Sequence, residues 1–432
     1  MCYTIRIMSV LAIIFYILSF LALYVQVFLL VTYFERKKEI FIRRDNISLP
    51  VYPTVTILVP CYNEESTVSK TLESLFSLDY PKDKLDIIVI DNNSKDNTWE
   101  VLKTYESNPQ VRIFKEEKVG KHNALNTGLL HVKTEFVGCL DADSSVHPEA
   151  LKRIITFFDN PHTMAVAPSI VVRDPKNIIQ YAQRAEYDMA HYNKKMLAFL
   201  GGIHVTPGPF SIFRKSVFDE LGPYRKAHHT EDQEIALRMQ QNGYKIDHAP
   251  DAYVYTGSPN SIPKLYRQRV RWIYGFIRNA FDYRKLIFRP EYGTIGLFTL
   301  PSGIISIMGT MFLLIYSITQ LYQYVERKIL QIASVGIHNT GNNLFSFNLF
   351  YFDTRIFIFI SVLLYVMVII GLINGRRMIY GREMMFWDIP LFILIYMVIA
   401  PFWLAKAVWN AVSNHEASWA EERDYSLTEN KL

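Results

Sequence analysis

The sequence predicts an α/β domain with a mostly parallel sheet, set between helices that span a membrane. Residues 54–256 alternate short apolar strands with helical segments, and long apolar runs lie before and after them. Half of the 432 residues are hydrophobic and 14% are aromatic, which is typical of a chain with membrane spans. Strands and helices that alternate at this spacing build a parallel sheet covered by helices on both faces.

The first predicted element is a transmembrane helix. Residues 7–34 carry no charged side chain, and the apolar run 10–33 is longer than the roughly 20 residues that cross a bilayer. A cleaved signal peptide fits poorly, because the run is too long and the positive charge follows it. The basic residues of segment 35–44 place the next domain on the cytoplasmic side by the positive-inside rule.

The α/β domain is expected to use its strands to present polar residues at one edge of the sheet. Ligands of such sheets bind beyond the carboxyl ends of the strands, where Pro60, Asp91 and Asp141 fall. The apolar patterns predict strands over 54–60, 85–91, 111–115 and 135–140, and helices over 66–78, 97–106 and 121–132.

Three further apolar segments follow the α/β domain, at 295–321, 356–373 and 384–404. Pro301, Gly303 and Gly309 predict that the first of them is kinked or partly interfacial. The basic loop 375–382 joins the last two and is expected on the cytoplasmic side, in agreement with the first span.

These patterns divide the chain into six parts. They are an N-terminal transmembrane helix (1–34), a basic linker (35–53), the α/β domain (54–256), an amphipathic interfacial region (257–292), a C-terminal transmembrane region of about three segments (293–410) and a polar tail (411–432).

Net charge and cysteine content limit the binding partners and the compartment that fit this chain. A net charge of +5 is too small to indicate nucleic acid, whereas basic residues near the ends of apolar segments fit anionic lipid head groups. Cys2, Cys61 and Cys139 are scattered and form no CxxC pair, which favours a reducing compartment and argues against a thiolate metal site. We expect each of them to be a small buried hydrophobe.

Asp141 and Asp143 are two residues apart at the end of a predicted strand. Strand alternation points both carboxylates the same way and sends Ala142 to the other face. Such a pair can hold a hard divalent cation, Mg2+ or Mn2+, which neutralises a diphosphate. The alternative is a pair of solvated loop aspartates, but the position directly after an apolar strand favours the metal.

Asp91 ends another predicted strand, before Asn92, Asn93 and Ser94. Its carboxylate can accept a hydrogen bond from the N–H of a nucleotide base. The alternative is a simple turn, because Asp-Asn-Asn-Ser is also turn chemistry.

The segment Thr230-Glu231-Asp232-Gln233 has two interpretations. In the first, it is a capping box with Thr230 as N-cap, and the helix dipole lowers the pKa values of both acids. This interpretation explains both acids without a catalytic role. In the second, Asp232 is a general base that takes a proton from an acceptor hydroxyl.

A helical conformation of Gln268-Arg269-Val270-Arg271-Trp272 places Gln268, Arg271 and Trp272 on one face. Arg271 can then bind a phosphate, and Trp272 can stack on a sugar ring. The alternative is a basic and aromatic helix at a membrane surface over 266–278. Both interpretations can hold at once.

Together, these motifs resemble the membrane-embedded processive glycosyltransferases of family 2, which include cellulose, hyaluronan and poly-N-acetylglucosamine synthases. The resemblance covers about residues 55–275. The matching motifs are Pro60-Cys61-Tyr62-Asn63-Glu64-Glu65, Asp91, Gly120-Lys121-His122-Asn123-Ala124-Leu125-Asn126, Asp141-Ala142-Asp143, Val205-Thr206-Pro207-Gly208-Pro209-Phe210, Thr230-Glu231-Asp232 and Gln268–Trp272.

The resemblance implies a GT-A fold that carries out inverting transfer from a UDP-sugar, with Asp232 as the base. It implies a divalent cation at Asp143 and Asp141, and contacts of Asp91 with the uracil. Nucleotide and diphosphate contacts are implied for Asp91, Lys121, Asp141, Gln268 and Arg271, and acceptor contacts for Glu231, Trp272, Gly208 and Phe210.

The product implied by the resemblance is a β-linked polysaccharide that is also moved across the bilayer, with N-acetylglucosamine as the first candidate sugar and an accessory subunit as a possible partner. Two departures stand out. Asn92 replaces the usual second aspartate. The tail segment 417–423 resembles a cytoplasmic tail, whereas four spans would place it on the opposite side.

Three other functions are weighed against this one. A non-processive transferase acting on a polyprenyl phosphate is disfavoured by Gln268–Trp272. A transporter whose soluble domain senses a nucleotide is disfavoured because 356–373 and 384–404 carry no inward-facing charge apart from Asp388. A Rossmann dehydrogenase would need a G-x-G-x-x-G after the first strand, which this chain lacks.

Overall fold

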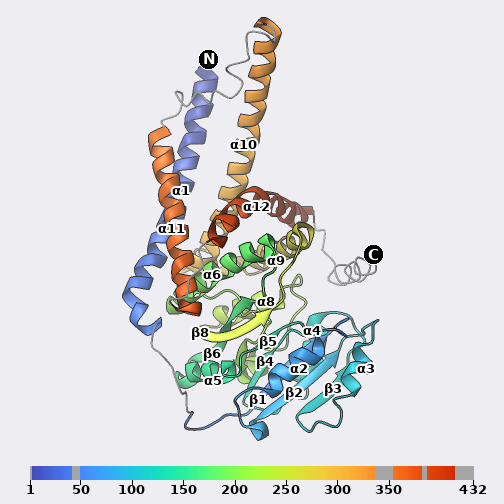
Figure 1. The fold of residues 1–432 in the computed structure, drawn as a ribbon. Coiled ribbons are helices and arrows are strands. Elements are labelled where there is room, and N and C mark those ends of the chain that lie inside the picture. Colours follow the sequence, from blue (N-terminus) through green and yellow to red (C-terminus); the bar gives the residue numbers. More distant parts are fainter. Residues whose placement is uncertain (1, 41–48, 336–353, 382–386, 414–432) are drawn as a thin grey trace. The chain divides into compact units, whose positions relative to one another are not determined.

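The computed structural model describes residues 2–40, 49–335, 354–381 and 387–413 (Figure 1). The chain divides into two compact units, one made of residues 1–28 and 302–370, the other of residues 29–301 and those from 371 onward. The second unit holds the sheet and all of the predicted site residues.

The sheet has eight strands in the order β3-β2-β1-β4-β7-β6-β8-β5. Its first half is parallel, which confirms the predicted architecture, whereas β7 runs antiparallel to both β4 and β6. The strands are β1 (Val55–Cys61), β2 (Leu85–Asp91), β3 (Val111–Lys115), β4 (Phe136–Cys139), β5 (Ser145–Val146), β6 (Thr163–Val172), β7 (Ile212–Arg214) and β8 (Lys245–Thr256).

The register of the parallel half brings its polar ends together. Cys61 of β1 pairs with Asp91 of β2, and Leu58 of β1 pairs with Cys139, the last residue of β4. Asp91 and the chain after β4 therefore lie at the same edge of the sheet, as predicted.

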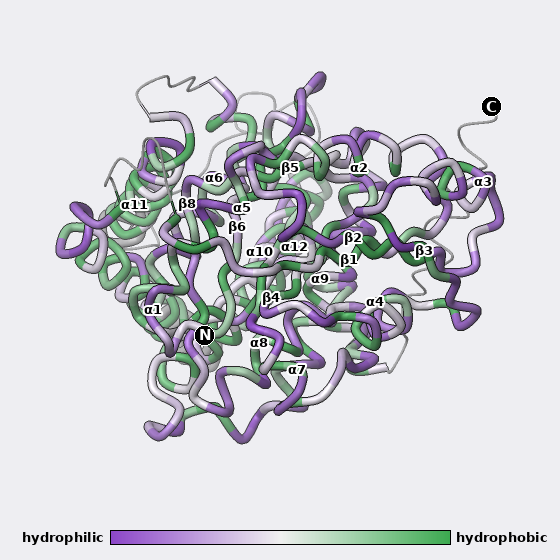
Figure 2. Tube along the Cα trace, turned by 90° about the horizontal axis from the view of Figure 1, so that it is seen from below, coloured by the Kyte–Doolittle hydropathy of each residue, from purple (hydrophilic) through white to green (hydrophobic). Residues whose placement is uncertain are grey.

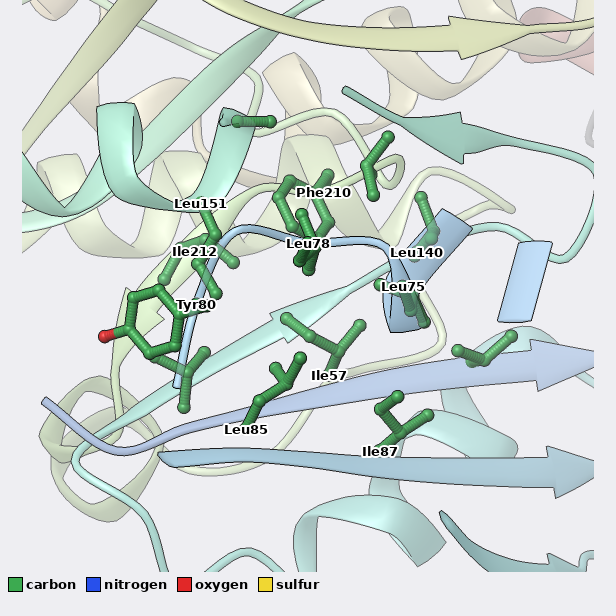
Figure 3. Packing of buried hydrophobic residues seen from close by; sticks show 14 of the residues in the cluster. Ile57, Leu75, Leu78, Tyr80, Leu85, Ile87, Leu140, Leu151, Phe210 and Ile212 are labelled. Atoms are coloured by element: carbon green, nitrogen blue, oxygen red, sulfur yellow. The ribbon is translucent and has the colours of Figure 1, made fainter. Parts of the chain in front are cut away.

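The strands β1, β2 and β4 are buried on both faces, which explains their largely apolar sequences. Along β1, Ile57 and Val59 enter one hydrophobic cluster and Leu58 enters the other. Figure 3 shows the first cluster, in which Ile57 and Ile87 pack with residues from outside the sheet. The hydropathy colouring of Figure 2 marks the central strands as hydrophobic.

Helices and short helical turns connect and cover these strands. The α-helices are α2 (Val68–Phe76), α3 (Thr98–Lys103), α4 (Lys121–Leu129), α5 (Ala150–Ile155), α6 (Ile178–Phe199), α7 (Ser216–Leu221), α8 (Glu231–Gln241) and α9 (Ile262–Asp282). The 3-10 turns are Lys82–Lys84, Thr156–Asp159, Arg284–Leu286 and Pro290–Tyr292, and Ile295–Thr299 is a π-helical turn.

Among the described residues, four helices are long and apolar enough to cross a membrane, so the chain is a membrane protein as predicted. They belong to α1 (Cys2–Ile40), α10 (Leu300–Val335), α11 (Thr354–Tyr380) and α12 (Asp388–Ser413). Pro301 lies in the first turn of α10, where the helix needs no N–H donor. Directly before α10, the backbone departs from regular α-helix in the π-helical turn Ile295–Thr299.

Candidate active site

Lys121 lies at the centre of the site, at the start of α4. Its Nζ is 2.6 Å from Asp141 Oδ1 and 3.3 Å from Glu231 Oε1. Burial alone would lower the pKa of Lys121, but these carboxylates outweigh it and hold that pKa well above its usual value. A Cβ at Gly208 would lie 2.5 Å from the same Nζ, so a side chain at this position would displace the ammonium group from its present place between the carboxylates.

Asp232 follows Glu231 in the first turn of α8 and lines a pocket with Lys121, Thr206, Gly208 and Glu231. Burial, together with the carboxylate of Glu231, raises the pKa of Asp232 to about 6. The prediction that the helix dipole lowers this pKa is therefore wrong, because loss of solvent outweighs it. A carboxylate with this pKa is well suited to proton transfer near neutral pH.

The predicted capping box is also wrong. Thr230 is the N-cap of α8, but its side chain makes no capping bond. Its Oγ1 donates to Ala227 O (3.0 Å) and accepts from Asn279 Nδ2 (2.9 Å), which belongs to α9. A Cβ at Gly275 of α9 would lie 2.2 Å from that Oγ1. Thr230 therefore joins the two motif helices, and helix capping no longer accounts for the acids that follow it.

The Asp141-Ala142-Asp143 triplet lies in a turn after β4 and not in an extended strand, so the predicted alternation does not apply. Ala142 is nevertheless buried, and both aspartates are half-buried. Thr71 of α2 fixes this turn, because its Oγ1 is 2.8 Å from Ala142 O and 2.7 Å from Ser144 O. This contact between the turn and α2 positions both aspartates, and no local sequence pattern revealed it.

These carboxylates can be compared with what a divalent cation needs. In the part of the chain that the structure describes, no three His, Cys, Asp or Glu side chains gather closely enough to hold an ion by themselves. Asp141 pairs with Lys121, and Asp143 Oδ1 accepts from Ser144 Oγ at 3.0 Å. Mg2+ is commonly bound by one or two carboxylates plus substrate phosphates, so the donor set fits an ion whose shell a diphosphate completes.

Asp91 ends β2 and is 3% exposed, and its Oδ1 has no hydrogen-bond partner. A buried carboxylate oxygen without a donor is costly, and the N–H of a bound base would satisfy it. Its neighbour Asn92 accepts from Gly120 N (2.7 Å) and donates to Lys118 O (2.7 Å). Asn92 therefore ties the end of β2 to the loop that precedes Lys121, a role that needs both a donor and an acceptor.

The predicted face of α9 reaches the same region. Arg271 Nη1 is 3.5 Å from His229 O, two residues before α8, and its positive charge opposes the burial that raises the pKa of Asp232. Gln268, Arg271 and Trp272 are all half-buried. The structure thus brings Arg271 near Asp232.

Arg269, between the predicted motif residues, was missed by sequence reasoning. It is 4% exposed, and its guanidinium forms two hydrogen bonds with Glu186 of α6, one of them 3.0 Å long. The same group lies 4.3 Å from the centre of the Trp272 ring and donates to Gln268 Oε1 at 2.6 Å. It therefore orients two of the three predicted motif residues. No local pattern marked Glu186 as its partner.

Phe210 does not line the pocket. Its side chain is fully buried and packs near Ile212 and Leu78 in the hydrophobic cluster of Figure 3. Its backbone has a φ of 66° and its N–H donates to Cys139 O. The predicted acceptor contact of Phe210 would need a rearrangement of the core, so its role here is to fix the loop that carries Gly208.

Cys61 and Cys139 are both buried, as expected, and neither forms a disulfide with a described residue. Cys139 lines the pocket beside Lys121, and burial raises the pKa of its thiol well above the usual value. It is therefore a poor nucleophile, and the pocket relies on its carboxylates.

Comparisons with known proteins identify the family and the fold of this chain. Residues 56–222 match the profile described as glycosyl transferase family 2. Poly-beta-1,6-N-acetyl-D-glucosamine synthase of Staphylococcus epidermidis is 30% identical over 312 residues, which is 72% of this chain and 72% of that protein. The synthase of the same name from Staphylococcus aureus strain COL is 31% identical over 281 residues, covering 63% of this chain and 66% of that one.

Among solved structures, a mannosyltransferase from Pyrobaculum calidifontis in complex with GDP-Man and Mn2+ superposes with a TM-score of 0.54. It shares 19% identity, and the match covers 82% of this chain and 99% of that one, which supports the fold. With the identity to the Staphylococcus synthases, these likenesses establish that the chain is a membrane-bound hexosyltransferase with a GT-A fold and belongs to glycosyltransferase family 2.

Proposed function

We propose that this enzyme transfers N-acetylglucosamine from UDP-N-acetylglucosamine to a growing β-linked polysaccharide, which it also moves across the membrane. The observation that carries this proposal is the pocket in which Asp232, with its raised pKa of about 6, lies beside the Lys121–Asp141 ion pair. The choice of sugar rests on the relatives named as poly-beta-1,6-N-acetyl-D-glucosamine synthases.

Asp232 acts as the general base in this proposal. At neutral pH most of it is ionised, since its pKa is about 6. It takes the proton from an acceptor hydroxyl, whose oxygen attacks the anomeric carbon as the bond to UDP breaks. One base and no enzyme nucleophile give a single displacement, so the configuration at that carbon inverts.

Asp91, Lys121 and Arg271 hold the donor. The unpaired Oδ1 of Asp91 accepts from the uracil N–H, while the cationic groups of Lys121 and Arg271 offset the charge that develops on the departing diphosphate. A divalent cation held by Asp143, with help from Asp141, would add a Lewis acid at the same diphosphate.

The acceptor meets Glu231 and Gly208, which line the pocket, and Trp272 of α9. Trp272 offers a ring on which a sugar stacks, and Arg269 fixes that ring by lying 4.3 Å from its centre. The proposed cytoplasmic position of the site is supported by the basic residues after the first span, through the positive-inside rule.

The test is UDP release by the purified, detergent-solubilised protein with a panel of UDP-sugars and Mg2+ or Mn2+, followed by sizing of the product. The proposal expects release from UDP-N-acetylglucosamine with a long polymer. A short or lipid-linked product would instead establish the non-processive transferase. Release from no donor, by folded protein, would refute the assignment.

Two substitutions connect activity to the site. Asp232→Asn should lower kcat by about 10²–10⁴-fold, the usual contribution of a general base. Asp143→Asn should abolish transfer while the protein stays folded. The matched control is Asp219→Asn on the exposed face of α7, which should leave kcat unchanged.

A further inference from the structure

Helix α12 contacts the catalytic domain along its whole length. At its first residue, Asp388 Oδ2 accepts from Arg184 Nε of α6 at 2.9 Å. In its middle, Tyr396 Oη is 2.5 Å from Glu186 Oε2 of α6. Near its end, Ala411 O accepts from Arg278 Nη1 of α9 at 3.4 Å. Figure 1 shows α12 beside α9, within the same compact unit.

These contacts are incompatible with a helix that crosses a bilayer. Between Asp388 and Ala411 the helix rises by about 35 Å, which exceeds the roughly 30 Å thickness of the hydrocarbon core. A spanning helix would therefore carry its last turn to the far side of the membrane. Its last turn instead contacts α9, the helix whose Gly275 packs against Thr230 of the active site.

The start of α12 is also fixed at the end of a span. Arg376, in the last turns of α11, is 3% exposed and bonds both Asp388 (2.8 Å) and Asp188 of α6 (2.6 Å). Since Phe359–Tyr380 of α11 is a candidate span, its end lies at a membrane surface. The helix α6 and the first turn of α12 then lie at that surface too.

The two sides of α12 differ in a way that fits this position. The polar side chains of Asp388 and Asn410 are buried against the domain, at 0% and 8% exposure. The opposite side is apolar and exposed, with exposed fractions of 57% to 78% at Leu394, Met397, Val398, Phe402, Trp409 and Val412. Lys406 is exposed near the edge of this side, where its ammonium can reach the head groups.

We propose that α12 does not cross the membrane and lies in its surface on the catalytic side, with the apolar side facing lipid. Composition alone makes it a candidate span, but its partners place it parallel to the surface. It then separates α9, with the Gln268–Trp272 motif, from the hydrocarbon.

This position resolves the conflict between the four predicted spans and the expected cytoplasmic side of the tail segment 417–423. With α1, α10 and α11 as the spans, the chain crosses three times and the C-terminal tail lies on the same side as the catalytic domain. That is the side expected from the resemblance of segment 417–423 to a cytoplasmic tail. The proposal is independent of the sugar and of the reaction.

The first test locates the end of α12 in sealed membrane vesicles with an impermeant maleimide. Single cysteines at Ser413, at Ser107 on the exposed surface of the catalytic domain and at Ser346 between α10 and α11 are compared in a Cys2→Ser background. The proposal expects Ser413→Cys to react from the same side as Ser107→Cys. Reaction from the side of Ser346→Cys would overturn it.

The second test measures depth with spin labels at Leu394, Val398, Phe402 and Trp409, in variants that retain sugar transfer. These positions cover about 22 Å of the helix axis. A surface helix gives the same shallow depth at all four, with each label accessible to lipid. A depth that passes through the bilayer centre would show a span, and labels shielded from lipid would show that protein covers this side; either result refutes the proposal.

Discussion

Gly275→Ala provides a sharp test of the contact between the two motif helices. The added Cβ would lie 2.2 Å from Thr230 Oγ1 and 2.4 Å from its Cγ2. Carbon atoms pack at about 3.5 Å or more, so the helices must separate by roughly 1 Å. Because Thr230 precedes Glu231 and Asp232, that separation moves the proposed base relative to Arg271.

The expected effect has two parts. Overpacking of this kind costs about 1–3 kcal/mol of stability. A displacement of about 1 Å at the reacting groups should lower kcat by roughly 100-fold. UDP release under saturating donor measures kcat, and thermal unfolding in detergent measures stability. Thr230→Ser in the same chain removes Cγ2, retains Oγ1, and should restore part of the activity.

The control is Gly257→Ala in the loop between β8 and α9. An added Cβ there meets nothing within 4 Å, and the glycine has no left-handed backbone. It should leave both kcat and stability unchanged. If Gly275→Ala retained a kcat within twofold of this control, the close contact of α8 and α9 would not position the base, and the reasoning would fail.

Three further predictions concern charge. Asp232 has a pKa of about 6 and must be ionised to accept a proton, so kcat should rise with pH through about 6 and level off above it. A rate of UDP release that stays flat between about pH 5 and 8 would contradict this. Glu186→Gln removes the charge that holds Arg269 and should lower kcat about tenfold, while a Glu186→Gln enzyme with full kcat would show that Arg269 does not depend on it. Asp188→Asn leaves Arg376 without one of its buried partners and should cost about 3 kcal/mol or more in unfolding experiments, whereas an unchanged midpoint would refute the stabilising role of the pair.

Much of the parallel half of the sheet was predictable, because apolar runs in the local sequence mark its strands. The strands β2 and β3 have the bounds that the apolar runs predicted, and Asp91 closes β2 as expected. Parallel strands buried on both faces leave continuous apolar sequences, which are easy to detect. The second half of the sheet was not predicted, since β7 has only three residues and runs antiparallel to its neighbours.

The errors at the site share a physical cause. The sequence predicted that Thr230 would cap its own helix, but the hydroxyl bonds Asn279, 49 residues away. It predicted a low pKa for Asp232 from the helix dipole, but burial by distant segments reverses the sign. Local rules give the partner that is nearest in sequence, whereas a packed interior offers competing partners that only the tertiary structure brings close.

The helix α6 illustrates why such partners stay hidden. Arg184, Glu186 and Asp188 lie within five residues, yet they bond α12, α9 and α11 in turn. Their separations in sequence are 204, 83 and 188 residues. From its sequence alone, a helix with this many charged residues is expected to lie exposed to solvent.

In the fold, α6 instead bonds the motif helix α9, the end of α11 and the start of α12. A buried ion pair stabilises a fold weakly when its desolvation is counted, but breaking it is costly, so such pairs specify one arrangement over others. We therefore expect α6 to fix where the chain enters the membrane surface after α11 and where the motif helix lies relative to Asp232.

Reversing both charges of one pair tests this expectation. The double variant Glu186→Arg with Arg269→Glu should recover part of the kcat that is lost in Glu186→Arg alone. Equal loss in the single and double variants would show that α6 contributes bulk and not a specific pairing.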